Sequence, residues 1–235
     1  MKPKDFEAEV IDIINQTPDV KTIRLKIPED IEFIPGQFCM VKIDKKLAPF
    51  TFASAPQKGY TELTIKQIGE VTKKMHNLKK GDKIQLRGPF GKDLNFENNV
   101  KKHVGMVAAG SGITPFMSII EFINNKKLEN YILLIYANRT REDIIYKNKL
   151  DDIVEKNNNI KVVYSLTKED LRNKGYEFGH VTQEMILKHS ENPQELTWYI
   201  CGPPNMNKDV KKILKKLKAK DIRIESWEIS GKFNR

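Results

Sequence analysis

The amino-acid sequence predicts two domains of different class, an antiparallel β-barrel domain followed by a Rossmann-like α/β domain with a parallel sheet. Three observations lead to this prediction. Residues 1–98 contain short, partly alternating strand patterns separated by turn residues. Residues 99–235 alternate apolar runs with helical patterns, which is typical of a doubly wound sheet. A length of 235 residues accommodates two small domains with separate cores.

Six short strands are expected in the first domain. Proline and glycine separate them, as at Pro35-Gly36 and Gly81-Asp82. Strands at this spacing predict a small antiparallel barrel or sandwich. The expected strands are Phe6–Ile14, Val20–Ile27, Gln37–Ile43, Phe50–Ser54, Glu62–Gln67 and Lys83–Leu86.

The second domain is expected to repeat strand and helix four times. Its apolar runs are typical of strands buried on both faces. The expected strands are Val104–Ala109, Ile132–Ala137, Lys161–Ser165 and Thr197–Cys201. The expected helices are Pro115–Asn125, Glu142–Glu155, Thr182–His189 and Asn205–Ala219. The change of pattern places the domain boundary near Phe96–Lys101, between domains 1–98 and 99–235.

Composition excludes several classes of protein. No apolar run approaches the roughly 18 residues of a membrane span, and the chain starts without a signal-like stretch, so we expect a cytoplasmic protein. Cys39 and Cys201 are far apart, so neither a disulfide framework nor a four-thiolate iron–sulfur site is expected within the chain. No metal site is predicted, because the four histidines lack ligand spacing: His76, His103, His180 and His189.

The formal net charge of +10 raises the question of a nucleic-acid partner. Acidic residues interrupt the basic ones in most segments, and the densest basic stretch is Lys208–Lys220. Within it Val210 and Leu214, among others, line one face of a helical pattern, so we expect the lysines to form the solvated face. No nucleic-acid binding is predicted.

A glycine-rich turn follows the first apolar strand of the second domain. Gly110-Ser111-Gly112 ends that strand, and a helix starts at Pro115, with Thr114 as a possible cap. Glycines allow a close backbone approach, and a helix start attracts a pyrophosphate. Pro115 occupies the third glycine position of the dinucleotide fingerprint, so tight packing is the alternative interpretation.

A second turn, at Trp198–Pro204, ends a later strand of the same sheet. Ligands of open parallel sheets gather at the carboxyl ends of strands, so this turn and Gly110–Thr114 are expected to line one crevice. Cys201 is expected beside a reacting ring there, and the alternative is a small buried hydrophobic residue.

In the first domain, Ala48–Ser54 places an aromatic ring next to a hydroxyl, which suits stacking on a planar ring and bonding to a ring nitrogen. A half-buried strand is the alternative. The turns at 69–72 and 87–91 are similarly ambiguous alone. In combination and in order, eight segments resemble the ferredoxin–NADP reductase superfamily over essentially the whole chain. They are PGQF (35–38), PFTFASAP (49–56), GEVT (69–72), RGPFG (87–91), AAGSGITPF (108–116), YANRT (136–140), GHVT (179–182) and CGPPNM (201–206).

The resemblance implies an FAD-binding barrel and an NAD(P)-binding domain. It assigns Phe50 to packing on the flavin ring, Thr51 to the flavin N5 atom, and Val71 and Thr72 to the FAD pyrophosphate. Pro49, Phe52 and Gly69 belong to the same two segments. The nicotinamide-nucleotide loop is Gly110, Ser111, Gly112, Ile113, Thr114 and Pro115, and the turn beside the nicotinamide is Cys201, Gly202 and Pro203. Thr51 and Cys201 would tune the geometry and polarity of hydride transfer, and either Trp227 or Phe233 would lie near the flavin.

One position departs from the family pattern. Ala48 stands where the family commonly has an arginine that contacts the flavin phosphates. Another cation could take that place, and FMN or a loosely held flavin stays open. The candidate cations are Lys45, Lys46, Lys73 and Arg87. Arg139 could pair with the 2′-phosphate of NADPH or be an ordinary surface residue, so the choice between NADH and NADPH stays open.

The predicted function is therefore hydride transfer from NAD(P)H to bound FAD, with electrons passed to a protein or small-molecule acceptor. An acidic ferredoxin or flavodoxin would suit the basic surface. One alternative is an electron-transfer subunit of a larger complex, although such relatives usually carry a C-terminal cysteine cluster. A second alternative is a binding module that has kept the fold and lost the flavin, to which Ala48 points.

Overall fold

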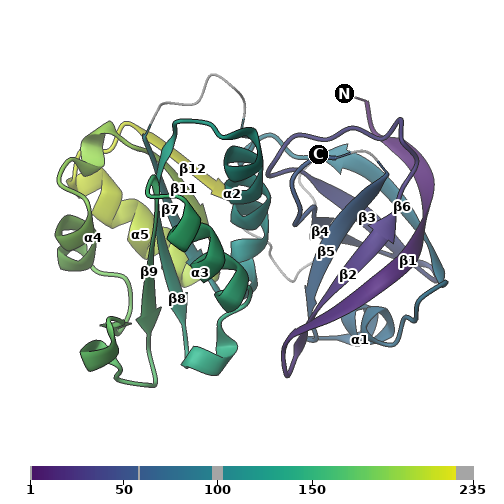
Figure 1. Cartoon of the computed structure of the whole chain (residues 1–235), viewed down its shortest axis with the longest axis horizontal. Coiled ribbons are helices and arrows are strands. Elements are labelled where there is room, and N and C mark those ends of the chain that lie inside the picture. Colours follow the sequence, from purple (N-terminus) through teal and green to yellow (C-terminus); the bar gives the residue numbers. More distant parts are fainter. Residues whose placement is uncertain (1, 58, 97–102, 226–235) are drawn as a thin grey trace. The chain divides into compact units, whose positions relative to one another are not determined.

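The computed structural model describes residues 2–57, 59–96 and 103–225 (Figure 1). The chain forms two compact units, residues 1–99 with 114–128, and residues 100–113 with 129–235. The first unit holds an antiparallel sheet and the second a parallel one. The predicted domain boundary falls largely on residues outside the described ranges and stays a prediction.

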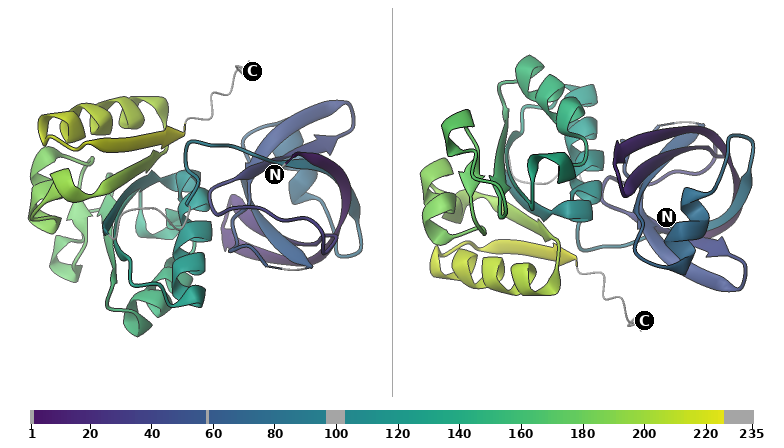
Figure 2. Two further views of the ribbon diagram at one scale, coloured as in Figure 1. Left: turned by 90° about the horizontal axis from the view of Figure 1, so that it is seen from above. Right: turned by 90° about the horizontal axis from the view of Figure 1, so that it is seen from below.

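The first unit is built on a six-stranded antiparallel sheet in the order β4-β3-β6-β1-β2-β5. Its strands are β1 (Lys4–Thr17), β2 (Val20–Lys26), β3 (Phe38–Ile43), β4 (Lys46–Thr51), β5 (Tyr60–Lys66) and β6 (Lys83–Phe90). The two edge strands meet where Phe52 bridges Leu63 and the Ala53 N–H donates to the Glu62 carbonyl at 2.8 Å. The strands accordingly curve around a common centre (Figure 2), and the predicted antiparallel barrel is confirmed.

Alternation along the strands supplies the core of this barrel. In β1, Phe6, Ala8 and Val10 are buried, whereas Glu7 lies between them on the outside, as a strand period of two requires. The same inward set recurs in the neighbouring strands. Its members include Ile23, Leu25, Val41, Phe52, Leu63, Ile65 and Leu86.

Helix α1 (Glu70–His76) was not predicted from the sequence, which indicated only a turn at 69–72. Its signal is Val71 and Met75, two apolar residues one helical turn apart that pack on the barrel core. His76 is also buried, and its Nε2 atom lies 2.8 Å from the Ile65 carbonyl, which supports the predicted structural role of this histidine. The helix was missed because it has only seven residues.

Helix α2 (Thr114–Lys126) groups with the first unit. The Ser118 hydroxyl donates to the Ser54 carbonyl at 2.7 Å, and the Glu121 carboxylate accepts the Ala55 N–H at 2.8 Å. Both side chains are buried. The helix is therefore fixed to the chain segment that follows β4.

The second unit is built on a parallel sheet in the order β10-β9-β8-β7-β11-β12. Its strands are β7 (His103–Ala109), β8 (Tyr131–Asn138), β9 (Ile160–Leu166), β10 (Glu177–Phe178), β11 (Thr197–Cys201) and β12 (Asp221–Glu225). Helices α4 (Gln183–His189) and α5 (Pro204–Lys216) pack on one face of it, where Ile186 and Leu214 join a buried cluster with Val107 and Trp198. The predicted Rossmann-like sheet is confirmed.

One expected helix of this unit needs correction, and two of its strands were not predicted. The expected helix at Glu142–Glu155 is a 3₁₀ turn, η2 (Arg141–Asp143), followed by α3 (Lys147–Lys156). Tyr146 separates them because its backbone is left-handed, with φ of 62°. Strands β10 and β12 were not predicted, because β10 has two residues and β12 alternates charged with apolar residues instead of forming an apolar run.

Along the described residues, no helix is long and apolar enough to cross a membrane.

Candidate functional site

The order of the strands locates a ligand site at one edge of the second sheet. From β7 the chain moves through β8 and β9 to one side, and it returns to place β11 on the other side of β7. Ligands of open parallel sheets bind where the strand order reverses, beyond the carboxyl ends of the strands. At that edge η1 (Gly110–Ile113) follows β7, and Gly202 follows β11.

These two turns lie in direct contact. A Cβ atom on Gly112 would stand 2.1 Å from the carbonyl oxygen of Cys201, where only a glycine fits. A Cβ atom on Gly202 would stand 3.2 Å from the Cβ atom of Ala109. The structure thus brings together the two glycine-containing segments that the sequence placed in one crevice.

The sequence predicts that glycines of this turn let a ligand approach the backbone closely. The structure gives the two glycines different roles. Gly112 is required by the Cys201 backbone, whereas Gly110 has no heavy atom within 4 Å of its ideal Cβ position and adopts φ of 51°. Tyr136 fixes the Gly110 carbonyl, because its hydroxyl donates to that oxygen at 2.9 Å. Burial raises the pKa of Tyr136, so the phenol stays protonated as a donor. The backbone at Gly110 therefore borders open space, and the next residue, Ser111, is exposed.

Cys201 ends β11 and is buried. Burial raises the pKa of its thiol, and the nearby Glu225 carboxylate acts in the same direction. The neutral thiol is therefore the form present at physiological pH, and a neutral thiol is a poor nucleophile.

A further polar residue at this edge, Asn138, was not singled out from the sequence. It is the last residue of β8 and only 6% exposed. Its amide lies near the Tyr136 hydroxyl, yet neither amide atom has a hydrogen-bond partner of normal geometry among the described residues. An unpaired buried amide costs about 1–3 kcal/mol, which a polar ligand group at this edge would offset. Its signal in the sequence was a single amide at the end of an apolar run.

Arg139 and Arg141 follow β8 and are exposed. Neither guanidinium has an acidic partner among the described residues, whereas the nearby Asp143 carboxylate accepts the backbone N–H and the hydroxyl of Thr140 at 3.0 and 2.9 Å. The two cations are therefore available to a phosphate.

The expected flavin strand lies in the first unit. Phe50 in β4 is partly buried and packs on the barrel core. Thr51, the next residue, is buried. The sequence predicts Phe52 as a cofactor-binding residue. Its ring is fully buried and stacks on Phe33 with centroids 4.2 Å apart, so the ring itself belongs to the core. Pro49, the preceding residue, is partly buried.

The predicted pyrophosphate segment forms the start of α1. The Thr72 hydroxyl accepts the N–H groups of Ile68 and Gly69 and donates to the Gly69 carbonyl, each at 2.9 Å. Thr72 is therefore committed to its own turn in this structure, and Val71 is partly buried on the barrel core.

The strand register shows on which face of the sheet two candidate cations lie relative to Ala48, the position where the family commonly has an arginine. Ala48 lies opposite Val41, whereas Pro49 and Arg87 both lie opposite Met40. Successive strand residues face opposite sides, so Arg87 is on the other face of the sheet from Ala48. Lys46, two residues before Ala48 in the same strand, shares its face and pairs with Glu70 at the start of α1.

The residues present fit a dinucleotide and a flavin. The open space at Gly110 and the unpaired amide of Asn138 suit the polar groups of a nucleotide at the carboxyl edge of the second sheet. The partly buried ring of Phe50 beside Thr51 suits packing against a planar ring system. Trp227 and Phe233, the predicted C-terminal aromatics, lie outside the described residues.

The matches to known protein families also divide the chain into a flavin-binding part and a nucleotide-binding part. Residues 7–94 match the family described as an oxidoreductase FAD-binding domain, and residues 106–212 match the oxidoreductase NAD-binding domain.

Individual relatives cover much of the chain. NADH-cytochrome b5 reductase 1 of Dictyostelium discoideum is 33% identical over 217 residues, which cover 87% of this chain and 74% of that protein. The plasma membrane-associated coenzyme Q6 reductase of Saccharomyces cerevisiae is 36% identical over 159 residues, covering 66% of this chain and 50% of that protein. The chain thus spans about half the length of some relatives and three quarters of others.

Solved structures share the fold. The cytochrome b5 reductase domain of Ulva prolifera nitrate reductase superposes with a TM-score of 0.81 over 95% of this chain and 97% of that one, at 21% identity. The FAD/NAD-binding domain of a Vibrio cholerae nitric oxide dioxygenase gives a TM-score of 0.86 over 94% of this chain and 98% of that one, at 17% identity.

Proposed function

The chain belongs to the cytochrome b5 reductase family of the ferredoxin–NADP reductase superfamily, and from that premise we propose that it oxidises NADH and delivers the electrons singly to a haem protein of the cytochrome b5 class. As a member of this family it is an NAD(P)H-dependent FAD oxidoreductase. The observation that carries the proposal is the contact between the two glycine-containing turns at the reversal of strand order.

In this proposal the first unit holds the flavin. Bound FAD accepts a hydride and releases electrons one at a time, which is chemistry that amino-acid side chains do not supply. Phe50 packs against the flavin ring, and Thr51 presents polar atoms to its reactive edge. Lys46 takes the place of the cation missing at position 48, because it shares the face of Ala48 and ends beside Glu70. Val71 contributes a backbone N–H group.

In this proposal the second unit holds the nucleotide. Gly110 and Ser111 leave room for phosphates, Thr114 and Pro115 start α2, and Asn138 binds a ribose hydroxyl with its unpaired amide. Gly112, Cys201 and Gly202 keep the two turns in contact. The neutral, buried thiol of Cys201 adds no charge beside the reacting ring.

We propose NADH as the preferred donor, because several relatives are named NADH-cytochrome b5 reductases. The exposed Arg139 offers a contact for NADPH, so its substitution measures the preference. Arg139→Ala is expected to lower kcat/KM for NADPH by about tenfold, the loss of one charge-assisted contact, and to leave NADH unchanged.

A quinone is the second candidate acceptor, favoured by the relative named a coenzyme Q6 reductase. An acidic ferredoxin or flavodoxin, the acceptor expected from the net charge, ranks below these two, because the relatives described above are named reductases of cytochrome b5 and of coenzyme Q6. Because the donor is an intracellular nucleotide, we propose that the reaction takes place on the cytoplasmic side.

The test is turnover of purified, FAD-loaded protein with NADH and each acceptor in turn: cytochrome b5, a short-chain quinone and a ferredoxin. The proposal predicts that kcat/KM is highest for cytochrome b5. A higher value for the quinone would favour the second candidate. A protein that binds no FAD, or that turns over with none of the three, would contradict the proposed function.

A further inference from the structure

The surplus positive charge of the chain is concentrated on one element. Helix α5 and the turn after it, residues 208–220, contain seven lysines and one acidic residue, Asp209, which gives a formal charge of +6. The whole chain carries +10, so the remaining residues contribute only +4. All seven lysines are exposed: Lys208, Lys211, Lys212, Lys215, Lys216, Lys218 and Lys220. We call this set the α5 lysine face.

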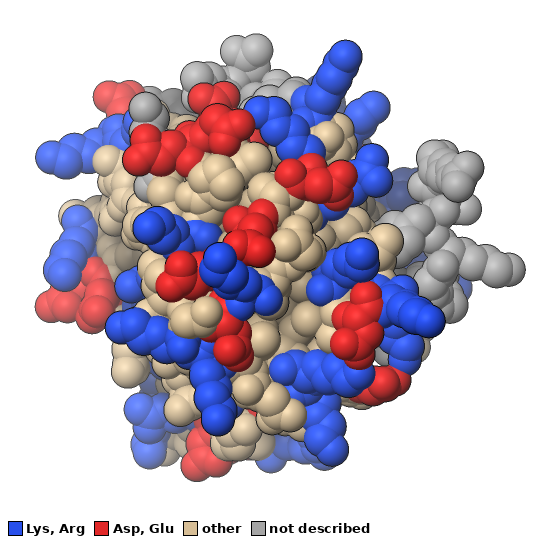
Figure 3. Space-filling view, turned by 90° about the vertical axis from the view of Figure 1, so that its right-hand side faces the viewer, with Lys and Arg blue, Asp and Glu red and all other residues tan. Residues whose placement is uncertain are grey.

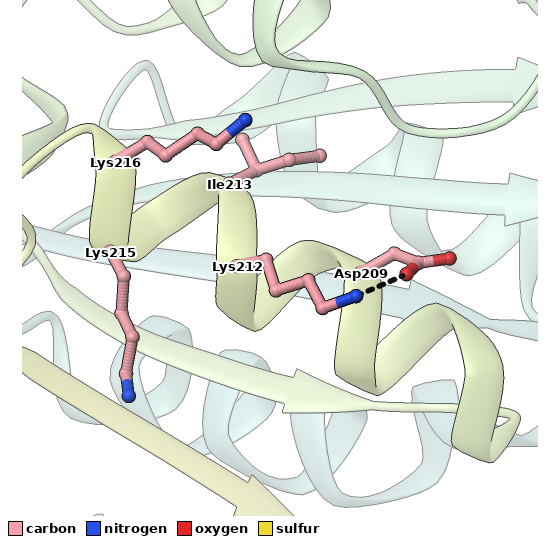
Figure 4. Close-up of a pocket in the computed structure, with 5 residues that line it drawn as sticks. All are labelled: Asp209, Lys212, Ile213, Lys215 and Lys216. Atoms are coloured by element: carbon pink, nitrogen blue, oxygen red, sulfur yellow. Dashed lines mark ion pairs between the residues drawn. The ribbon is translucent and has the colours of Figure 1, made fainter.

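Several lysines elsewhere in the chain have acidic partners. Ion pairs join Lys4 to Asp30, Lys66 to Asp19, Lys83 to Glu7, Lys147 to Asp151 and Lys188 to Glu177. Figure 3 shows such a mixed face, with red groups interleaved among the blue ones. On the α5 lysine face, within the described part of the chain, only Lys212 has an acidic partner, Asp209 at 3.9 Å (Figure 4).

The helix presents these lysines on a fixed support. Val210 and Leu214 are buried in the core of the second unit, so the opposite side of α5 faces outward. Lys208, Lys211, Lys212 and Lys215 follow one another at helical spacing, on a helix that the sheet holds in place. Figure 4 shows Lys212, Lys215 and Lys216 extending away from the helix around Ile213.

We propose that the α5 lysine face docks the protein on an anionic phospholipid surface. The charge is complementary to such a surface, and a lysine cluster on an amphipathic helix needs no further feature to bind it. A protein partner would call for aromatic or arginine anchors, and interfaces are depleted in lysine. Residues 204–220 contain neither an aromatic residue nor an arginine. The same absence disfavours single-stranded nucleic acid, which stacks on aromatic rings.

The test is cosedimentation of the full chain, loaded with FAD, with vesicles of phosphatidylcholine alone or with about 30% phosphatidylserine, at low salt and at about 0.5 M salt. The α5 variant combines Lys208→Gln, Lys211→Gln, Lys212→Gln and Lys215→Gln. The matched control removes the same charge from paired lysines: Lys4→Gln, Lys66→Gln, Lys83→Gln and Lys188→Gln. NADH oxidation with a soluble acceptor verifies that both variants are folded.

The proposal predicts binding to phosphatidylserine vesicles only, released by salt. Each lysine near such a surface contributes about fivefold, so the α5 variant is expected to bind at least about 100-fold more weakly, and the control within about fivefold of the parent. Equal weakening of both variants would show that only net charge matters and would overturn the proposal. Absence of vesicle binding by the parent chain, or binding to an acidic protein or to nucleic acid in its place, would overturn it as well.

Discussion

The candidate ligand sites of the two units differ in what forms them, which is mainly backbone in the second unit and side chains in the first. At the carboxyl edge of the second sheet the shape comes from backbone, since Gly112 touches the Cys201 carbonyl and Gly110 leaves open space. In the flavin site that we propose for the first unit, the shape comes from side chains, namely Phe50, Thr51 and Lys46 on one strand. A site made of backbone is damaged by adding a single carbon atom, whereas a site made of side chains is damaged by removing atoms.

The largest effect is expected from Gly112→Ala. The added Cβ atom would stand 2.1 Å from the Cys201 carbonyl oxygen, so the two turns must separate. Displacing a positioning loop by about 1 Å lowers turnover by about 100-fold, and we expect this loss in kcat/KM for NADH. FAD content, measured by absorbance after gel filtration, should be unchanged.

Gly175→Ala is the control for this substitution. Gly175 has a positive φ of 84° and no heavy atom within 4 Å of its ideal Cβ position, so it reports backbone strain without collision. A similar loss of NADH turnover in both variants would contradict the role of the contact between the turns.

The next effect is expected from Glu121→Ala, which removes the acceptor of the Ala55 N–H. The loss of this charge-assisted bond and the buried N–H left behind are expected to lower the free energy of unfolding by about 2 kcal/mol. Glu121→Gln keeps an oxygen at the site and should lose less. Urea denaturation checks both, with the exposed helical Glu155→Ala as control. Equal losses for the Ala and Gln variants would contradict a role as acceptor.

Phe50→Ala is expected to weaken FAD binding by about tenfold, through loss of an aromatic contact. Leu47→Ala, in the same strand and 59% exposed, is the control. Fluorescence titration with FAD measures both affinities. If Phe50→Ala binds FAD as tightly as the parent chain, the proposed flavin contact of this side chain is wrong.

The smallest effect concerns pH. Burial raises the pKa of the Cys201 thiol, so above about pH 8.5 an unfolded chain releases a proton that the folded chain retains. Stability is therefore expected to be independent of this thiol at neutral pH and to fall by about 1.4 kcal/mol per pH unit above that pH.

Cys201→Ala should remove this part of the alkaline slope, which urea denaturation at several pH values measures. The buried Cys39 has a raised pKa of the same origin and should contribute its own slope in both proteins. An unchanged slope in the variant would contradict a buried, neutral thiol at position 201.

The sequence predicted the elements that have a clear period or a glycine signature. Apolar runs such as Ile132–Ala137 were buried strands, and the turns at Gly110–Gly112 and Cys201–Gly202 met as expected. The edge strand β12 was missed because Ile222 and Ile224 alternate with charged residues. A strand at a sheet edge needs no continuous apolar run.

Polar residues buried by tertiary packing were also missed. Asn138 and Glu121 carry no local pattern, because their burial depends on segments distant in sequence, such as Ala55 for Glu121. For Phe52 the alternation of strand residues could not have corrected the expectation, because residues two apart share a face and Phe52 lies two residues after Phe50. Its ring serves the core by stacking on Phe33.

The central claim is that a flavin held by the first unit is reduced by a nicotinamide nucleotide held with the second. Its most direct test is an anaerobic titration of the FAD-loaded protein with NADH, followed in the flavin absorbance band at about 450 nm. We predict complete bleaching with one equivalent of NADH in the parent chain, and slow bleaching in Gly112→Ala at unchanged FAD content. A bound flavin that dithionite bleaches and NADH does not would contradict the claim.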